Sequence, residues 1–215
     1  MRTKTLLLTA ALAAAGAVSS QAQSVYSVNA VGYANVPLKV GFNMVANPFV
    51  VSDSHIEALI PTAPDQTVVY PFDNGSYSGP FTYFGPPDNV WDPAGGVITF
   101  GHGAFINAPT AFTITFVGEV QQGAPIHNTY QAGFNMLSSK VPQQADIAAL
   151  GLAAPPDQTA VYTYDADTGY AGPWTYFGPP DNIWDPAAIP TINIGQAFWL
   201  NAPAAGDWTR TFSVN

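Results

Sequence analysis

An internal repeat is the feature of this sequence that most constrains how the chain can fold. Residues 41–44 (GFNM) recur as residues 133–136, and residues 64–67 (PDQT) recur as residues 156–159. The block 82–93 returns as 175–186 with a single change, from Val90 to Ile183. Because each copy has the length of a small domain, the repeat predicts two related units in tandem, at residues 23–120 and 121–215.

Alternating apolar residues predict that each unit is built from short strands. In residues 68–72 the first, third and fifth side chains share one face, and residues 112–116 repeat this alternation. Pro71 lacks the N–H that a ladder needs, so its strand is expected at a sheet edge. One segment per unit, 54–59 and 146–150, has a helical pattern and opens with a residue that can cap it. With frequent Gly and Pro between the strands, these patterns predict an all-β chain of two tandem β-sandwich or barrel-like repeats, each with one short helix.

The first residues of the chain predict export. Arg2 and Lys4 precede an uncharged apolar run, and small residues then stand at the two positions that a signal peptidase reads. Residues 1–22 are therefore expected to be a signal peptide, since the apolar run is shorter than a bilayer span requires. No later stretch of the sequence has the length and hydropathy of a membrane span. We expect a secreted protein, located outside the cell, at its surface or in the periplasm.

Composition excludes several classes of partner and chemistry. The chain has 215 residues, of which 5 are Lys or Arg, 14 are Asp or Glu and none is Cys. So few cations cannot neutralise a row of phosphates, which excludes sequence-independent nucleic-acid binding. The lack of cysteine excludes disulfides, thiolate zinc sites and cysteine nucleophiles. A charged content of 9% with 47% hydrophobic residues favours a packed or self-associating chain over a disordered one.

Catalytic motifs are missing from the sequence. His55, His102 and His127 have no histidine counterparts in the other unit. No nucleophile elbow, zinc-binding HExxH motif or phosphate-binding glycine loop occurs. A glycosidase would need two facing carboxylates, and because Glu57 and Glu119 are the only glutamates, the pair would have to come mainly from aspartates such as Asp88 and Asp92. Those two lie in one short loop, where capping its amides is the simpler role. We therefore expect no enzymatic activity, no catalytic residues and no cofactor.

An acidic turn in the second unit raises the question of calcium. Asp165 and Asp167 alternate as the oxygen ligands of a hard cation do in a tight loop. The first unit has only Asp73, Asn74 and Gly75 at the matching place. An Asp-rich hairpin turn explains both segments more simply, so no metal site is predicted.

The repeated block 82–93 and its second copy contain the candidate ligand-binding residues. The Gly-Pro-Pro-Asp-Asn segment is typical of an ordered surface loop, and aromatic residues flank it on both sides. Aromatic faces beside Asp and Asn suit a sugar ring, which stacks through its C–H face and hydrogen-bonds through its hydroxyls. One such platform binds weakly, so two copies on one polysaccharide would gain affinity through avidity. The candidates are Tyr83, Phe84, Asp88, Asn89, Trp91 and Asp92, with Tyr176, Phe177, Asp181, Asn182, Trp184 and Asp185.

Two structural alternatives accompany these predictions. Trp91 and Trp184 would not bind a ligand if they are core side chains beneath loops that close the sandwich. Self-association is a second route to a partner, because the expected first strand, residues 27–41, has no strand before it and the second unit ends at Asn215. Unpaired strand edges are templates for pairing, so copies could join head to tail through their terminal strands. Head-to-tail association is not expected if the first strand completes its own sheet.

Two repeated segments resemble the signatures of a known type of module. Residues 41–48 and 101–106 resemble the opening GWNLISNP and closing GQGFWV signatures of a β-rich module found in many exported bacterial proteins, and residues 195–200 match the closing signature better. Residues 24–33 resemble the mature start of uncharacterised secreted proteins of the Verrucomicrobia. The resemblance implies a tandem exported β-domain and implies no activity, because most members of this group have no assigned function.

These observations support two hypotheses. The first is an exported, non-catalytic structural or adhesive protein of the surface or extracellular space, built from two homologous β-domains. The second is a carbohydrate-binding module with one weak aromatic platform per unit. The exposure of Trp91 and Trp184 separates them, since only an exposed ring can stack on a sugar.

Overall fold

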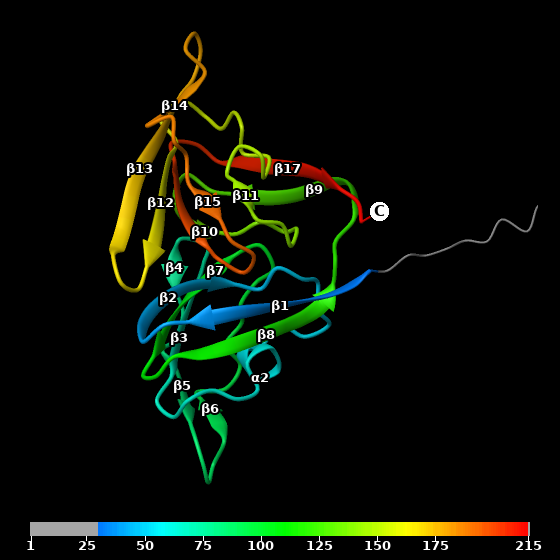
Figure 1. Ribbon diagram of the computed structural model, residues 1–215, viewed down its shortest axis with the longest axis vertical. Helices are drawn as coiled ribbons and strands as arrows, with labels where there is room; N and C mark the ends of the chain where they lie inside the picture. The colour runs from blue at the N-terminus through cyan, green and yellow to red at the C-terminus, as the bar shows by residue number, and fades with distance from the viewer. Residues whose placement is uncertain (1–29, 215) are drawn as a thin grey trace, which may run out of the picture.

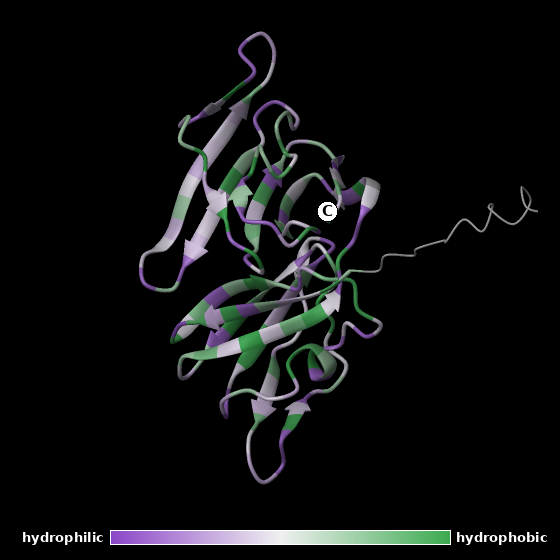
Figure 2. Ribbon diagram, turned by 45° about the vertical axis from the view of Figure 1, so that its right-hand side comes forward, coloured by the Kyte–Doolittle hydropathy of each residue, from purple (hydrophilic) through white to green (hydrophobic). Residues whose placement is uncertain are grey.

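The computed structural model describes residues 30–214, and nearly all of its regular structure is antiparallel β-sheet (Figure 1). Hydrophobic and hydrophilic residues alternate along the strands, as Figure 2 shows. This alternation allows each strand to bury one face and expose the other. The prediction of an all-β chain is confirmed. The expected signal peptide, residues 1–22, lies outside the described residues.

The first half of the described chain, here called the first unit, contains one large sheet and a two-stranded ribbon. Its strands are β1 (Val31–Leu38), β2 (Gly41–Ala46), β3 (Val68–Asp73), β4 (Ser76–Tyr77), β5 (Phe81–Phe84), β6 (Val90–Asp92), β7 (Gly103–Ala108) and β8 (Phe112–Glu119). The large sheet has the order β2-β7-β3-β5-β6, with β4 beside β3, and the ribbon pairs β1 with β8 over their full length. A short helix, α2 (Ile56–Leu59), packs beside the sheet with Ile56 and Leu59 buried.

The second half, here called the second unit, repeats this arrangement. Its strands are β9 (Gly123–Tyr130), β10 (Gly133–Leu137), β11 (Ala145–Asp146), β12 (Ala160–Asp165), β13 (Gly169–Phe177), β14 (Ile183–Asp185), β15 (Thr191–Ile192), β16 (Phe198–Ala202) and β17 (Gly206–Phe212). The sheet order β10-β16-β12-β13-β14 matches that of the first unit, and β9 pairs with β17 as β1 pairs with β8. The repeated sequence therefore folds into repeated topology.

The first strand of each unit pairs within its own unit, so the premise of head-to-tail association through free terminal strands is wrong. In the first unit Val36 lies opposite Ile114 and Leu38 opposite Phe112. Val36, Leu38 and Ile114 are buried on one face of the ribbon. Register in such a ribbon is set by the buried face, because a slip of one residue would expose every apolar side chain.

Two local predictions also need correction. The strand that contains Pro71 is internal, lying between β7 and β5. Proline is tolerated there because β5 pairs only with Val68 and Val69, and the Pro71 carbonyl instead accepts the Ser78 N–H at 2.9 Å. The second expected helix, 146–150, is a turn that follows β11. Asp146 does cap it as expected, since its Oδ1 atom accepts the Ala149 N–H at 2.7 Å.

Three hydrophobic clusters hold the structure together. One lies within the first unit and one within the second. The third is made by both units, which lie one above the other in Figure 1. Its buried members are Met44, Ala46, Phe72, Phe105, Met136, Ala197 and Trp199. Since burial of apolar side chains is the main stabilising term in folding, this third cluster makes the two units one packed body.

Candidate functional site

The repeated Gly-Pro-Pro-Asp-Asn segments are ordered loops at opposite ends of the molecule (Figure 1). One joins β5 to β6 and the other joins β13 to β14. In the first unit the Asp65 Oδ1 atom accepts the Gly85 N–H at 2.8 Å. In the second unit the Asp157 Oδ1 atom accepts the Gly178 N–H at the same distance. The ordered loop is therefore present, but its anchoring carboxylate comes from an earlier turn.

The tyrosine and tryptophan rings that flank these loops are core side chains. Tyr83, Trp91, Tyr176 and Trp184 are only 2 to 9% exposed. Within each unit the two rings pack together, with centroids 5.2 and 5.4 Å apart. Such rings offer no face to a sugar, so the stacking platform expected from them does not form. The structural alternative, core rings beneath a closing loop, describes them correctly.

The other predicted residues of the loops lie at or near the surface. Phe84 is exposed and Phe177 is half-buried. Asn89 and Asn182 serve the loops themselves, since each donates from Nδ2 to a proline carbonyl at 3.2 Å. The exposed polar candidates are Asp88, Asn89, Asp92, Asp181, Asn182 and Asp185. The two sets are separated along the long axis of the molecule, so they do not form a shared site.

A different group of rings, which the sequence did not indicate, gathers where the two units meet. Phe42, Tyr77, Phe134 and Tyr170 are 43, 49, 52 and 59% exposed. They stand over buried or half-buried rings of the third cluster, namely Phe72, Phe105, Trp199, Tyr70, Tyr162 and Tyr164. We call these ten rings the aromatic surface. Two hollows of about 250 and 480 Å³ lie in it, and Tyr170 lines both.

Equivalent rings of the two units are arranged in the same way. Phe42 meets Phe105 edge to face at 5.9 Å and 85°, and Phe134 meets Trp199 at 5.9 Å and 86°. Contacts also cross between the units, since Phe72 lies 4.7 Å from Trp199. Edge-to-face pairs at these distances are favourable, so the rings hold one another in fixed positions.

The repeated GFNM motif explains much of this arrangement. Gly41 has a φ of 90°, which a residue with a side chain rarely adopts, and it opens β2 after a tight turn. Asn43 locks that turn by accepting the Lys39 N–H at 2.9 Å and donating to the Lys39 carbonyl at 2.8 Å. Phe42 belongs to the aromatic surface and Met44 to the third cluster. A phenylalanine kept at the same place in both copies was the signal that could have revealed this surface.

The opening and closing signatures meet across the units. The Ala46 N–H donates to the Gly195 carbonyl at 2.9 Å, and the Ala197 N–H donates to the Met44 carbonyl at 3.2 Å. The reciprocal contact is present as well, since the Ser138 N–H donates to the Gly101 carbonyl at 3.0 Å. The opening segment of each unit thus contacts the closing segment of the other, as in a twofold-symmetric dimer.

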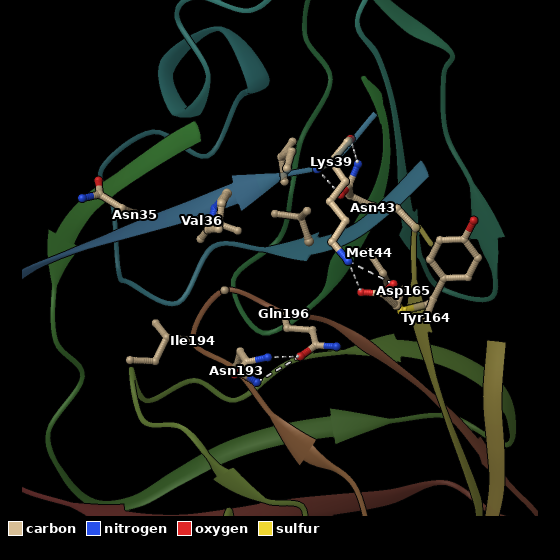
Figure 3. A pocket seen from close by; sticks show the side chains of 15 residues that line it. Asn35, Val36, Lys39, Asn43, Met44, Tyr164, Asp165, Asn193, Ile194 and Gln196 are labelled. Atoms are coloured by element: carbon tan, nitrogen blue, oxygen red, sulfur yellow. Dashed lines mark hydrogen bonds and ion pairs between the residues drawn. The ribbon is translucent and has the colours of Figure 1, made fainter. Parts of the chain in front are cut away.

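Beside the aromatic surface lies a groove of about 360 Å³ between the two units. Figure 3 shows its walls: Asn35, Val36 and Lys39 come from β1 and the turn after it, and Asn193, Ile194 and Gln196 from the loop before β16. Tyr164 of β12 lines both this groove and the smaller aromatic hollow. The groove and the aromatic surface therefore adjoin at Tyr164.

Lys39 forms a double ion pair at the end of the groove nearest Tyr164 (Figure 3). Its Nζ atom lies 2.8 Å from Asp165 Oδ2 and 2.6 Å from Asp167 Oδ2. These hydrogen bonds raise the pKa of Lys39 and lower the pKa of Asp165. The two carboxylates considered as calcium ligands are thus bound by an ammonium group. No group of three or more His, Asp or Glu side chains with the geometry of a metal site occurs within residues 30–214.

The equivalent place on the other side of the interface is filled. There His102 takes the position of Gln196, and its Nδ1 atom lies 2.9 Å from Asp73 Oδ1. Thr99, the counterpart of Asn193, donates to Asp73 Oδ2 at 2.9 Å. Lys140 Nζ lies 5.4 Å from the centre of the Phe100 ring and donates to a backbone carbonyl at 2.8 Å. The two units have diverged here, so that one side is packed and the other is open.

Stability is expected to depend on the protonation of His102. Burial lowers the pKa of His102 below its ordinary 6.5, aided by Lys140 and opposed by Asp73. Below pH 6.5 the unfolded chain then binds more protons at this residue than the folded chain, so its contribution to stability is lost as the pH falls through the folded pKa. His102→Gln, which copies the second unit, should reduce the fall in melting temperature between about pH 7.5 and 5. Identical pH profiles for the two proteins in a thermal melt would contradict this expectation.

Comparisons with known proteins add no further information on the site. No protein-family model, curated protein or solved structure matches the chain. Within residues 30–214, the structure contains no helix with the length and hydropathy needed to cross a membrane.

Proposed function

We propose that this is an exported, non-catalytic protein that acts structurally or adhesively, and that the aromatic surface is its contact face. The observation that carries the proposal is the exposure of Phe42, Tyr77, Phe134 and Tyr170, each between 43 and 59%, within one patch. Contiguous exposed apolar surface is unusual on a monomer and marks interaction sites. Aromatic residues are also the type most enriched in protein contact faces.

The rigidity of the patch supports the same role. Its rings come from strands of both units and are held by edge-to-face contacts 4.7 to 5.9 Å between centroids. A contact face that is already ordered loses little side-chain entropy on binding, which favours affinity. The patch forms only where the two tandem units pack together, so the repeat itself would contribute to the contact face.

Removing the exposed rings is expected to abolish adhesion. The test uses the chain without its expected signal peptide, residues 23–215, and the triple variant Phe42→Ser, Phe134→Ser and Tyr170→Ser. Retention is measured on insoluble peptidoglycan, cellulose and chitin, and self-association by sedimentation velocity. We expect the parent protein to be retained or to associate, and the variant to lose this at least about 10-fold, which corresponds to about 1.4 kcal/mol.

A matched control separates this contact face from general stickiness. Val31, Tyr33 and Val117 on the β1–β8 ribbon are 75, 73 and 57% exposed, so their accessibility is comparable to or greater than that of the rings. The triple variant Val31→Ser, Tyr33→Ser and Val117→Ser should behave like the parent. Equal losses in both triple variants, or a parent protein that neither binds nor associates, would refute the proposal.

A second candidate function, carbohydrate binding, is favoured by one observation. The groove beside the rings is lined by amide side chains, those of Asn193 and Gln196. Amides and aromatic faces together are what a sugar chain requires, whereas the loops first considered for this role hold their rings in the core.

A further inference from the structure

We infer that the groove between the units binds a neutral polysaccharide chain, which continues past Tyr164 onto the aromatic surface. This inference rests on the proposed function, because it names the ligand of the same contact face. It moves carbohydrate recognition from the two loops at the ends of the molecule to one site at its centre.

The continuity of the hollows supports a chain-like ligand. Tyr164 lines both the groove of about 360 Å³ and the hollow of about 250 Å³, and Tyr170 lines both that hollow and the one of about 480 Å³. Each lies at or near the low end of the range typical of small-ligand pockets. Three adjoining hollows with shared walls suit a polymer that places successive sugar units along them.

Hydrogen-bonding groups in the groove are oriented and available. Gln196 Oε1 accepts the Asn193 backbone N–H at 3.1 Å and the Asn193 Nδ2 group at 3.0 Å. This fixes the amide, and Figure 3 shows its nitrogen turned away from Asn193. Asn35 contributes less, because its Oδ1 atom accepts the Thr115 hydroxyl at 2.7 Å and Figure 3 shows its amide turned away from Gln196. The Nε2 group of Gln196 has no partner among residues 30–214 and can donate to a sugar hydroxyl.

The charges around the groove favour a neutral chain over an anionic one. Lys39 is the cation at the groove, and its ammonium group is already bound by Asp165 and Asp167. The whole chain carries a formal charge of −9, which repels uronate or sulfate groups. A ligand rich in hydroxyls and free of charge is the one that these walls can hold.

The two units differ at this place, and only the side with the groove leaves amide groups facing an open space. On the opposite side His102, Thr99 and Asp73 bond to one another, and Lys140 lies against Phe100. In the second unit the positions of Thr99 and His102 hold Asn193 and Gln196, whose amides face an open groove.

The test measures affinity for soluble neutral polysaccharides by isothermal titration calorimetry, with mixed-linkage β-glucan, xyloglucan and galactomannan as probes and alginate as the anionic control. The protein is residues 23–215. The variants are Asn193→Ala with Gln196→Ala for the groove, and Tyr170→Ser for the rings. The double variant Asp88→Ala and Asp181→Ala serves as the matched control at the distant loops. Thermal melts establish that each variant is folded.

We expect at least one neutral probe to bind, and the groove and ring variants each to raise its Kd at least 10-fold while the loop variant leaves it unchanged. An unchanged Kd in the groove variant, or binding of alginate in preference to the neutral probes, overturns the inference. A parent protein that binds no probe but still adheres or self-associates through the rings also overturns it and leaves the proposed function standing. If the ring variants behave like the parent protein in every assay, both this inference and the proposed function are overturned.

Discussion

Trp91→Ala is expected to lower the free energy of unfolding by about 3–5 kcal/mol. The indole is 6% exposed, packs 5.2 Å from the Tyr83 ring and donates from Nε1 to the Ile60 carbonyl at 2.9 Å. Removing it leaves a cavity under the β5–β6 loop and an unpaired carbonyl beside α2. Denaturant unfolding followed by circular dichroism measures the loss. A change below about 1 kcal/mol would show that the loop, rather than the ring, closes this end of the sheet.

Phenylalanine variants make the test sharper, because the two equivalent indoles differ in one bond. Trp91 Nε1 has the Ile60 carbonyl as its partner, whereas Trp184 Nε1 is buried with no partner among the described residues. Trp91→Phe therefore leaves a buried acceptor unsatisfied, at a cost of about 1–3 kcal/mol, while Trp184→Phe removes an unsatisfied donor. Trp91→Phe should be the more destabilising of the two. Val90→Ala, at a side chain 49% exposed, should have little effect.

The buried indoles also show how far the sequence could predict the site. Alternation of apolar residues identified strands, and Gly and Pro identified turns, because both follow from local backbone geometry. The same pattern, an aromatic residue beside a Gly-Pro-Pro loop, is compatible with an exposed ring or a buried one. Trp184 became a core residue through packing against Tyr176, which is a tertiary contact. Exposure of a ring is decided by such contacts, so the loop site could not be judged from the sequence.

The interface between the units could not be predicted from the sequence, for a related reason. Residues 68–72 were predicted to alternate faces, and Tyr70 and Phe72 do both pack at the third cluster. What covers that face depends on how the second unit docks. The hydrogen bonds of Ala46 and Ala197 across the interface join segments far apart in the chain. The repeat predicted two similar units, but it did not predict that their signatures would contact each other.

Pro71 and residues 146–150 illustrate the same limit at the level of single elements. A proline is confined to an edge strand only where the neighbouring strands on both sides would need its backbone N–H. Here β5 pairs with Val68 and Val69 but not with Pro71. The segment 146–150 has the cap of a helix, with Asp146 bonded to the Ala149 N–H, yet it stops after one turn. Isolated turns of this length gain little from helix propagation, so neighbouring strands decide whether a helix continues.

The largest effect on the interface is expected from Trp199→Ala. Trp199 is 8% exposed and contacts rings of both units, with centroids 4.7 Å from Phe72 and 5.9 Å from Phe134. Its removal leaves a cavity between the units, at a cost of about 3–5 kcal/mol in the free energy of unfolding. Because the third cluster couples the units, we expect calorimetry to show one transition for the parent protein and two for the variant.

Phe134→Ala is the matched control for this experiment. Phe134 belongs to the same group of rings but is 52% exposed, so its loss should cost less than about 1.5 kcal/mol and preserve the single transition. If Trp199→Ala also unfolds in one transition with a similarly small loss, the coupling would have to reside in the backbone bonds of Ala46 and Ala197. If it splits the transition, the aromatic surface and the coupling of the two units depend on the same buried ring. An exposed binding patch would then be maintained only while the tandem units stay packed.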